Sequence, residues 1–136
     1  MFNEHGEFKV TIQGDILLAF VSGAWNLETA KAYRETMLKT IESANGNFLC
    51  LISNVNAWEL CTPDCQLLMG QLAKECIAKG LKREAVVNEN IESVKMDLFR
   101  KHTIKNTTKT SLDAFQRSFF ETDTEAREWQ KKQGVA

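Results

Sequence analysis

The residues of this sequence that could take part in the most kinds of chemistry are its four cysteines, Cys50, Cys61, Cys65 and Cys76. Thiols bind metals, form disulfides or act as nucleophiles, and only three residues separate Cys61 from Cys65. No further pair of Cys or His follows at the spacing of a zinc finger, so we expect neither a metal site nor another cofactor. A single reactive thiol therefore remains as the cysteine-based function to consider.

Cys65 has the position of a reactive thiol and also that of a core residue. Residues 62–64, Thr-Pro-Asp, predict a helix start, with an N-cap hydroxyl, a proline and a carboxylate near the positive end of the helix dipole. The third helical position falls on Cys65, where the dipole lowers a thiol pKa if water reaches the sulfur. In the same helical phase Cys65 joins an apolar stripe: Leu68, Met69, Leu72 and Cys76. Two interpretations stay open, a thiol-dependent redox sensor or enzyme at Cys65 and a small buried residue.

The rest of the sequence has few of the groups on which enzymes depend. Its two histidines, His5 and His102, fall near the N-terminus and at a predicted helix end, so neither is expected to pair with a Ser or Cys nucleophile. The glycines form neither a dinucleotide-binding motif nor a phosphate-binding loop. We therefore expect a protein that is not an enzyme.

The predicted secondary structure follows from the apolar periodicity. Residues 8–13 alternate between apolar and polar, which predicts a half-buried strand, and Gly14-Asp15 predicts a type II′ turn into an apolar strand at 16–21. Later stretches alternate between the 3.6-residue period of helices and short apolar runs typical of buried parallel strands. They predict, in order, a helix at 26–44, a strand at 48–55, a helix at 62–79, a strand at 83–87, a helix from Asn90, a strand at 115–120 and a helix at 122–133.

This order of elements predicts the fold class. The chain of 136 residues has the length of one domain and no internal repeat, so we expect a single domain over residues 1–136. Strands that alternate with helices after an opening hairpin indicate an α/β fold with a mixed sheet, in which right-handed crossovers join parallel strands. We expect about five strands and about four helices.

The composition argues against several classes of partner. The net charge is −1, and the basic stretch at 100–117 lacks interleaved aromatic residues, so we interpret it as a solvated connector and expect no nucleic-acid binding. The longest apolar run, ILLAFV at 16–21, is too short to span a bilayer, so no integral membrane segment is expected. The first residues lack the pattern of a signal peptide, and we expect a cytoplasmic protein with reduced thiols.

Residues 54–65, NVNAWELCTPDC, form the predicted junction between a buried strand and a helix. Trp25, just before the first predicted helix, fits the staple position of a helix start. Trp58 has no periodic place, and a tryptophan in a loop serves either as a core contact or as an anchor for a ligand or partner. We therefore predict a binding site near this junction that contains Trp25, Asn56, Trp58 and Thr62.

The sequence resembles the SpoIIAA-like family, single-domain bacterial relatives of the STAS domain of anti-sigma-factor antagonists. The resemblance rests on GAWNLETAKAY at 23–33, which opens the first predicted helix, and on RSFFETDTEAREWQ at 117–130, a strand that leads into a helix. It implies a small sheet flanked by helices, and binding of a protein partner or small ligand in place of catalysis. It also implies a regulatory Ser or Thr, phosphorylated by a partner kinase, at the start of the helix after the central strand. Thr62 is the nearest hydroxyl here, although the longer stretch SNVNAWELCTPD replaces the compact Asp-Ser turn of the family.

The leading hypothesis is therefore a non-enzymatic cytosolic binding or regulatory domain that engages a protein partner or a small apolar ligand near residues 54–65. Two alternatives stay open, thiol chemistry at Cys65 and a phosphorylation switch at Thr62, which is also the predicted N-cap. The fold class is also similar to that of CRAL-TRIO domains, which bind apolar ligands beside the sheet, and this supports the ligand hypothesis by analogy only. A homodimer is a further expectation.

Overall fold

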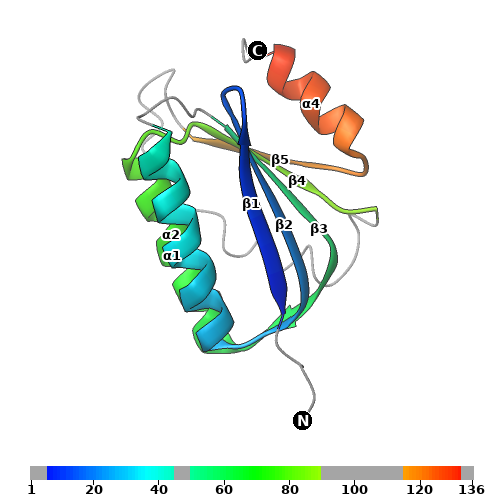
Figure 1. The fold of residues 1–136 in the computed structure, drawn as a ribbon. Helices are drawn as coiled ribbons and strands as arrows, with labels where there is room; N and C mark the ends of the chain where they lie inside the picture. Colours follow the sequence, from blue (N-terminus) through cyan, green and yellow to red (C-terminus); the bar gives the residue numbers. More distant parts are fainter. Residues whose placement is uncertain (1–5, 45–49, 90–114, 133–136) are drawn as a thin grey trace.

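Five strands form one mixed sheet, and helices cover both of its faces (Figure 1). The computed structural model describes residues 6–44, 50–89 and 115–132. The strand order is β1-β2-β3-β4-β5, with β1 antiparallel to β2 and all other neighbours parallel. The elements are β1 (Glu7–Gln13), β2 (Ile16–Trp25), α1 (Leu27–Ser43), β3 (Cys50–Cys61), α2 (Pro63–Ala78), β4 (Arg83–Val87), β5 (Gln116–Phe120) and α4 (Asp123–Lys132).

The mixed five-stranded sheet confirms the predicted fold class, with one difference in the helices. Three helices lie in the described residues, whereas the sequence predicts about four in the whole chain. The additional helix, expected from Asn90 onward, falls in residues 90–114, outside the described part. Helices α1 and α2 lie together on one face of the sheet and α4 lies on the other (Figure 1). Right-handed crossovers between successive parallel strands explain why α1 and α2 share a face.

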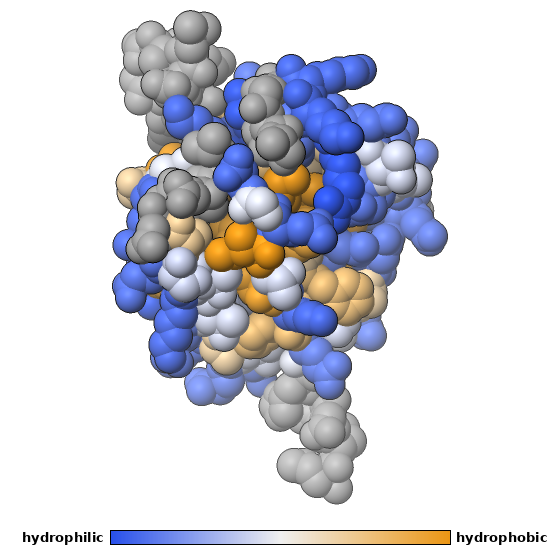
Figure 2. Space-filling view, turned by 45° about the horizontal axis from the view of Figure 1, so that its top comes forward, coloured by the Kyte–Doolittle hydropathy of each residue, from blue (hydrophilic) through white to orange (hydrophobic). Residues whose placement is uncertain are grey.

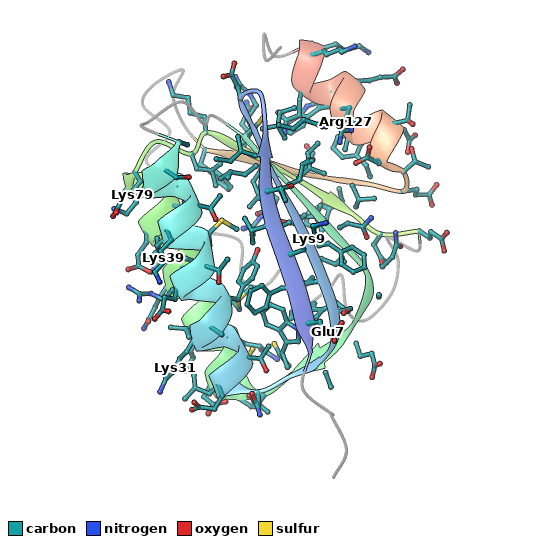
Figure 3. All side chains as sticks on the ribbon, viewed as in Figure 1. Glu7, Lys9, Lys31, Lys39, Lys79 and Arg127 are labelled. Atoms are coloured by element: carbon teal, nitrogen blue, oxygen red, sulfur yellow. The ribbon has the colours of Figure 1, made fainter. Side chains whose placement is uncertain are left out.

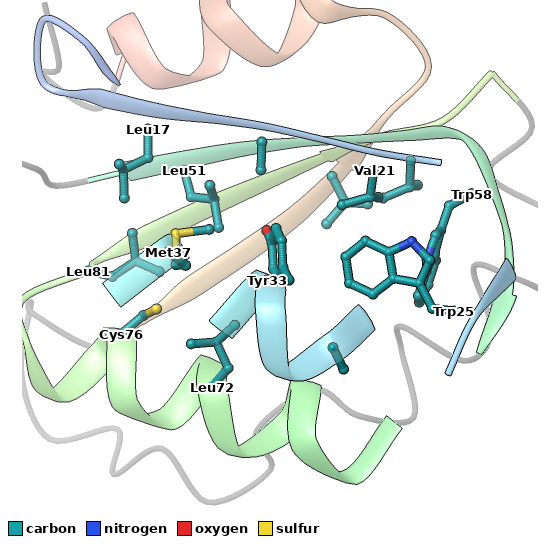
Figure 4. Close-up of a cluster of buried hydrophobic side chains, with 14 of the residues drawn as sticks. Leu17, Val21, Trp25, Tyr33, Met37, Leu51, Trp58, Leu72, Cys76 and Leu81 are labelled. Atoms are coloured by element: carbon teal, nitrogen blue, oxygen red, sulfur yellow. The ribbon is translucent and has the colours of Figure 1, made fainter. Parts of the chain in front are cut away.

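Two hydrophobic cores form, one on each face of the sheet. Side chains of β2 alternate between them, with Leu17 and Ala19 facing α1 and α2 and Ile16 facing α4. The larger core joins the sheet to both long helices, and its members include Val21, Trp25, Tyr33, Met37, Leu51, Trp58 and Leu72 (Figure 4). Full burial of one large apolar side chain contributes about 1.5–3 kcal/mol. This core therefore fixes α1 and α2 against the sheet.

The predicted N-caps hold both long helices at their starts. Asn26 Oδ1 accepts a hydrogen bond from Thr29 N at 2.9 Å at the start of α1. Thr62 Oγ1 accepts one from Cys65 N at 3.4 Å at the start of α2. These side chains satisfy backbone N–H groups that have no partner within the helix, which confirms the predicted positions of both helix starts.

Charged side chains cover the outer faces of the helices. Lys31 and Lys39 point away from the sheet on α1 (Figure 3). Arg34 Nε of α1 donates to Glu75 Oε1 of α2 at 2.8 Å, so one ion pair joins the two helices. Because these side chains are well exposed, such pairs contribute only about 0–1 kcal/mol each. The apolar core, and not the surface charge, holds the helices in place.

Strand β3 is longer than the sequence predicts. Residues 56–61 continue the strand past its predicted end at residue 55, so the prediction of a loop between the strand and the helix is wrong over these residues. Strand β2 likewise continues to Trp25, and the two strands pair with each other beyond the end of β4.

Two β-bulges explain why the sequence of this extension does not alternate between apolar and polar residues. The pairing between β2 and β3 shifts once between Phe20 and Ser22 and again between Gly23 and Trp25, because β3 has an extra residue in each interval. A bulge breaks the two-residue alternation of a strand. Val55 and Trp58, three positions apart, consequently both enter the larger core.

Figure 2 shows one face of the protein, on which hydrophilic residues surround hydrophobic residues that gather in the middle and continue toward the lower part of the view. The large hydrophobic side chains exposed in the described residues are Ile12, Phe20 and Leu67. Leu67, on α2, is 67% exposed, more than either of the others. No helix in the described residues is long and apolar enough to cross a membrane.

Two glycines at α2 give opposite predictions for stability. A Cβ at Gly70 meets no atom within 4 Å, so Gly70→Ala should stabilise the fold by about 0.5–1 kcal/mol through helix propensity. Gly80, after α2, has a φ of 119°, and Gly80→Ala should destabilise the fold by about 1–2 kcal/mol because L residues avoid this conformation. Urea unfolding measures both effects, and a change of the same sign in both variants would contradict the prediction.

Candidate functional site

Trp25 and Trp58, two residues of the predicted site, lie inside the protein. Trp25 is 2% exposed and Trp58 is 6% exposed. Their rings pack edge to face with 5.9 Å between centroids, and the Tyr33 ring lies 5.1 Å from Trp25. Trp25 Nε1 donates a hydrogen bond to Ser22 O at 2.9 Å, which satisfies the polar atom of the ring. Both tryptophans therefore hold the extended end of β2 and β3 together, and neither presents its ring at the surface.

Asn56 and Thr62, the other two predicted residues, are exposed. Asn56 Oδ1 accepts a hydrogen bond from Glu89 N at 2.6 Å, which joins the extended part of β3 to the chain that follows β4. Thr62 lies at the start of α2, immediately after β3. The four predicted residues share the junction but are divided between its interior and its surface.

The surface at the start of α2 is negatively charged and closely hydrogen-bonded. The Thr62 hydroxyl donates to Asp64 Oδ1, which also accepts from Cys65 N at 2.9 Å. The hydrogen bond from Thr62 is the main cause that lowers the pKa of the Asp64 carboxyl, so this group is charged at neutral pH. A phosphate on Thr62 would remove the N-cap and stand beside a like charge.

Cys61 and Cys65 meet at the junction, where their thiols share a hydrogen bond. Cys65 is fully buried, and this hydrogen bond followed by burial raises the pKa of its thiol far above the ordinary value. Cys61 is partly exposed, and the hydrogen bond from Cys65 lowers the pKa of its thiol. The thiol that ionises first is therefore Cys61, because Cys65 keeps its proton and donates it to the Cys61 sulfur. A nucleophilic Cys65 lacks both the exposure and the pKa that it needs.

No metal site accompanies these thiols within residues 6–44, 50–89 and 115–132. No group of three or more His, Cys, Asp or Glu side chains in these ranges is arranged to hold a metal ion. Two thiols alone do not complete a tetrahedral site.

A cavity of about 100 Å³ lies between α2 and the sheet, behind the junction. Most of its walls are apolar: Val21, Met37, Leu51, Val55, Met69, Leu72, Leu81 and Phe115. Trp58 and Cys61 line it as well, so the predicted junction forms part of its wall. An apolar cavity with a few polar groups is the usual form of a small-molecule site.

Three polar side chains form a buried network in the cavity wall. Arg117 Nε donates to Glu84 Oε1 at 2.7 Å, and Ser53 Oγ donates to Glu84 Oε2 at 2.8 Å. The side chains of Arg117 and Glu84 are each 8% exposed, so this ion pair is nearly out of water. Each charge depends on the other, because a lone buried charge is strongly unfavourable.

This network has no counterpart among the residues predicted for the site. Arg117 contradicts the interpretation of residues 100–117 as a solvated connector, since its side chain is buried; residues 100–114 lie outside the described part. A usable signal lies in the strands themselves, because Glu84 in REAVV and Arg117 in QRSFF each occupy the second position. Parallel pairing places these opposite charges side by side.

Tyr33 reaches from α1 toward this network. Figure 4 shows its ring extending from α1, with the hydroxyl at the end nearest the sheet. Burial, followed by the charge on Glu84, raises the pKa of the Tyr33 hydroxyl well above its ordinary value, so this group is neutral. Within the described residues, neither this hydroxyl nor the two terminal nitrogens of Arg117 has a hydrogen-bond partner. The cavity thus combines apolar walls with hydrogen-bond donors that no described residue uses.

Solved structures with the same arrangement of elements confirm the expected SpoIIAA-like fold. The unphosphorylated anti-sigma factor antagonist SpoIIAA is 13% identical, with a TM-score of 0.58 over 95% of this chain and 100% of its own. An uncharacterised protein of the DUF3478 family with a SpoIIAA-like fold, from Shewanella loihica, is 15% identical, with a TM-score of 0.61 over 92% of this chain and 93% of its own. An anti-sigma factor antagonist from Mycobacterium paratuberculosis is 11% identical, with a TM-score of 0.61 over 96% and 97%. No protein-family model matches the chain, and no curated protein is similar to it in sequence.

Cys61 should react first with iodoacetamide in the native protein. Its thiol is partly exposed and has a lowered pKa, whereas burial raises the pKa of Cys50 to about 11 and that of Cys76 to about 12. Timed labelling near neutral pH, followed by peptide mass spectrometry, gives the order, and the urea-unfolded chain is the control. Cys65→Ala should slow the labelling of Cys61, because it removes the hydrogen bond that stabilises the Cys61 thiolate. Faster labelling of Cys65 than of Cys61 would show that the thiol assignment is wrong.

Removing one charge of the buried ion pair should lower the free energy of unfolding more than removing both charges. Arg117→Met leaves the Glu84 carboxylate buried without its cation and should destabilise the fold by about 3–5 kcal/mol. The double variant Glu84→Met/Arg117→Met removes both charges and should recover most of that loss. Urea unfolding of the single and double variants forms a double-mutant cycle. Additive losses in the double variant would mean that the two charges do not depend on each other.

Proposed function

We propose that this protein is a non-enzymatic regulatory domain that binds a protein partner through the surface at the β3–α2 junction. The exposed residues that define this junction surface are Asn56, Glu59, Thr62, Asp64 and Leu67. Leu67 carries the proposal, because it is a large hydrophobic side chain, 67% exposed, on the first turns of α2.

The junction surface has the composition of a small interface. Burial of one leucine side chain contributes about 1.5–3 kcal/mol to association before the costs of binding. The polar residues around Leu67 are suited to form the rim that orients a partner and excludes water. The charged Asp64 carboxylate adds a preference for a partner with a basic patch.

The solved structures with this fold support a regulatory role. Two of them are anti-sigma factor antagonists by name, and SpoIIAA is known in an unphosphorylated form and, from Bacillus, in a phosphorylated form. For the present chain, the corresponding and more specific hypothesis is phosphorylation of Thr62. Thr62 is exposed, but its hydroxyl already caps α2 and donates to Asp64. Partner binding is therefore proposed without a phosphorylation step.

A small apolar ligand in the cavity is the second candidate function. The cavity behind the junction favours it, because its walls are mostly apolar and include Trp58. In this candidate Trp58 acts from inside the protein, as part of the cavity wall.

Site-specific photocrosslinking in the native host tests the junction surface. A photoreactive amino acid at position 67 should give a discrete protein adduct, and the same amino acid at position 39 should not, since Lys39 lies on the exposed outer face of α1. Excess unlabelled protein should suppress the adduct, whereas excess Leu67→Asp protein should not. Identical adducts from positions 39 and 67, or none from position 67, would sink the proposal.

A further inference from the structure

We propose that the cavity binds a small neutral molecule with an apolar body and one hydrogen-bond-accepting group, such as a ketone, an aldehyde or an ester. This inference rests on the second candidate above, that the cavity holds a ligand. It goes further because it names the chemistry of the ligand and the two side chains, Tyr33 and Arg117, that recognise it.

The volume of the cavity and its apolar walls determine which apolar part of a ligand fits. Its volume is about 100 Å³, and aliphatic and aromatic side chains form most of its lining. An apolar cavity of roughly 150 Å³ holds the six heavy atoms of benzene, so an apolar ligand body of about four heavy atoms suits this smaller site. Gly70 also lines the cavity, and a Cβ added there meets no atom within 4 Å, which marks unfilled space beside α2.

The hydrogen-bond donors in the cavity wall determine which polar group of a ligand fits. Ser53 already donates to Glu84, and Arg117 Nε does the same. The Tyr33 hydroxyl and the terminal nitrogens of Arg117 have no partner within the described residues, although Tyr33 is 4% exposed and the Arg117 side chain 8%. Tyr33 and Arg117 both line the cavity, and donors beside apolar walls are stabilised by an acceptor placed there. The group that fits them must therefore accept hydrogen bonds.

The charge balance of the site makes the ligand neutral. Glu84 and Arg117 neutralise each other at 2.7 Å, so the wall carries no net charge from this pair. A carboxylate ligand would add an uncompensated negative charge near Glu84, and an ammonium ligand would add a positive one near Arg117. An uncompensated charge in an apolar cavity is strongly unfavourable. A neutral acceptor obtains the hydrogen bonds without this cost.

Four probes of similar size test the inference by ligand-observed NMR titration of the whole chain: 2-pentanone, its isostere 2-methyl-1-pentene, pentanoate and pentylammonium. The ketone and the alkene have the same shape, so they separate acceptor recognition from apolar burial. Both should bind, and the two charged probes should bind at least about tenfold more weakly than the ketone. Tighter binding of pentanoate or pentylammonium than of 2-pentanone would overturn the inference.

Variants of the donors give the decisive comparison. Tyr33→Phe removes only the hydroxyl and should weaken 2-pentanone about fivefold while leaving 2-methyl-1-pentene unchanged. Glu84→Met/Arg117→Met, which keeps the wall free of a lone charge, should weaken the ketone in the same selective way. If both variants bind the ketone as the unmodified protein does, recognition of an acceptor is wrong, although the cavity still holds a ligand.

A cavity-filling variant separates this inference from the candidate on which it rests. Gly70→Leu should abolish binding of both the ketone and the alkene, with a urea midpoint that shows the protein is folded. If neither neutral probe binds to the unmodified protein, the cavity is not a ligand site and both proposals fail. If the neutral probes bind equally well to Gly70→Leu, they bind elsewhere and the cavity assignment is wrong.

Discussion

The pairing of β2 with β3 beyond the end of β4 is the constraint on which the rest of the structure depends. Trp25 pairs with Cys61 at the last positions of these strands, and Thr62 N donates to Trp25 O at 3.1 Å. The N-caps follow at once, Asn26 for α1 and Thr62 for α2. The two helices therefore begin side by side because the two strands end side by side.

The same extension gives the junction an inside and an outside. The bulges in β3 direct Trp58 into the core, where it lines the cavity, while Asn56 remains at the surface. Cys61 lies between the two, since it is partly exposed and also lines the cavity. A single stretch of chain thus forms one wall of the cavity and one edge of the junction surface.

Local signals made much of the fold predictable from the sequence. The Gly14-Asp15 turn, the caps at Asn26 and Thr62 and the helical stripe of α2 each depend on neighbouring residues, and the structure confirms them. The extension of β3 was not predictable, because its bulges remove the alternation by which a strand is recognised. The Glu84–Arg117 pair depends on which strands become neighbours, and this information is absent from either segment alone. The sequence located the junction but not the division of its residues between core and surface.

The ion pair in the cavity wall also bears on how the last strand finds its place. β5 joins the sheet after a long interval of chain and contributes only five residues, Gln116–Phe120, which pair with β4 alone. A shift of one residue would turn Arg117 to the opposite face and leave Glu84 without its cation. The charge pair therefore favours one register of β5 against β4, and apolar residues of the same size would not have this effect. The pair matters less for the stability of the sheet than for the free-energy cost that it gives to other alignments of β5.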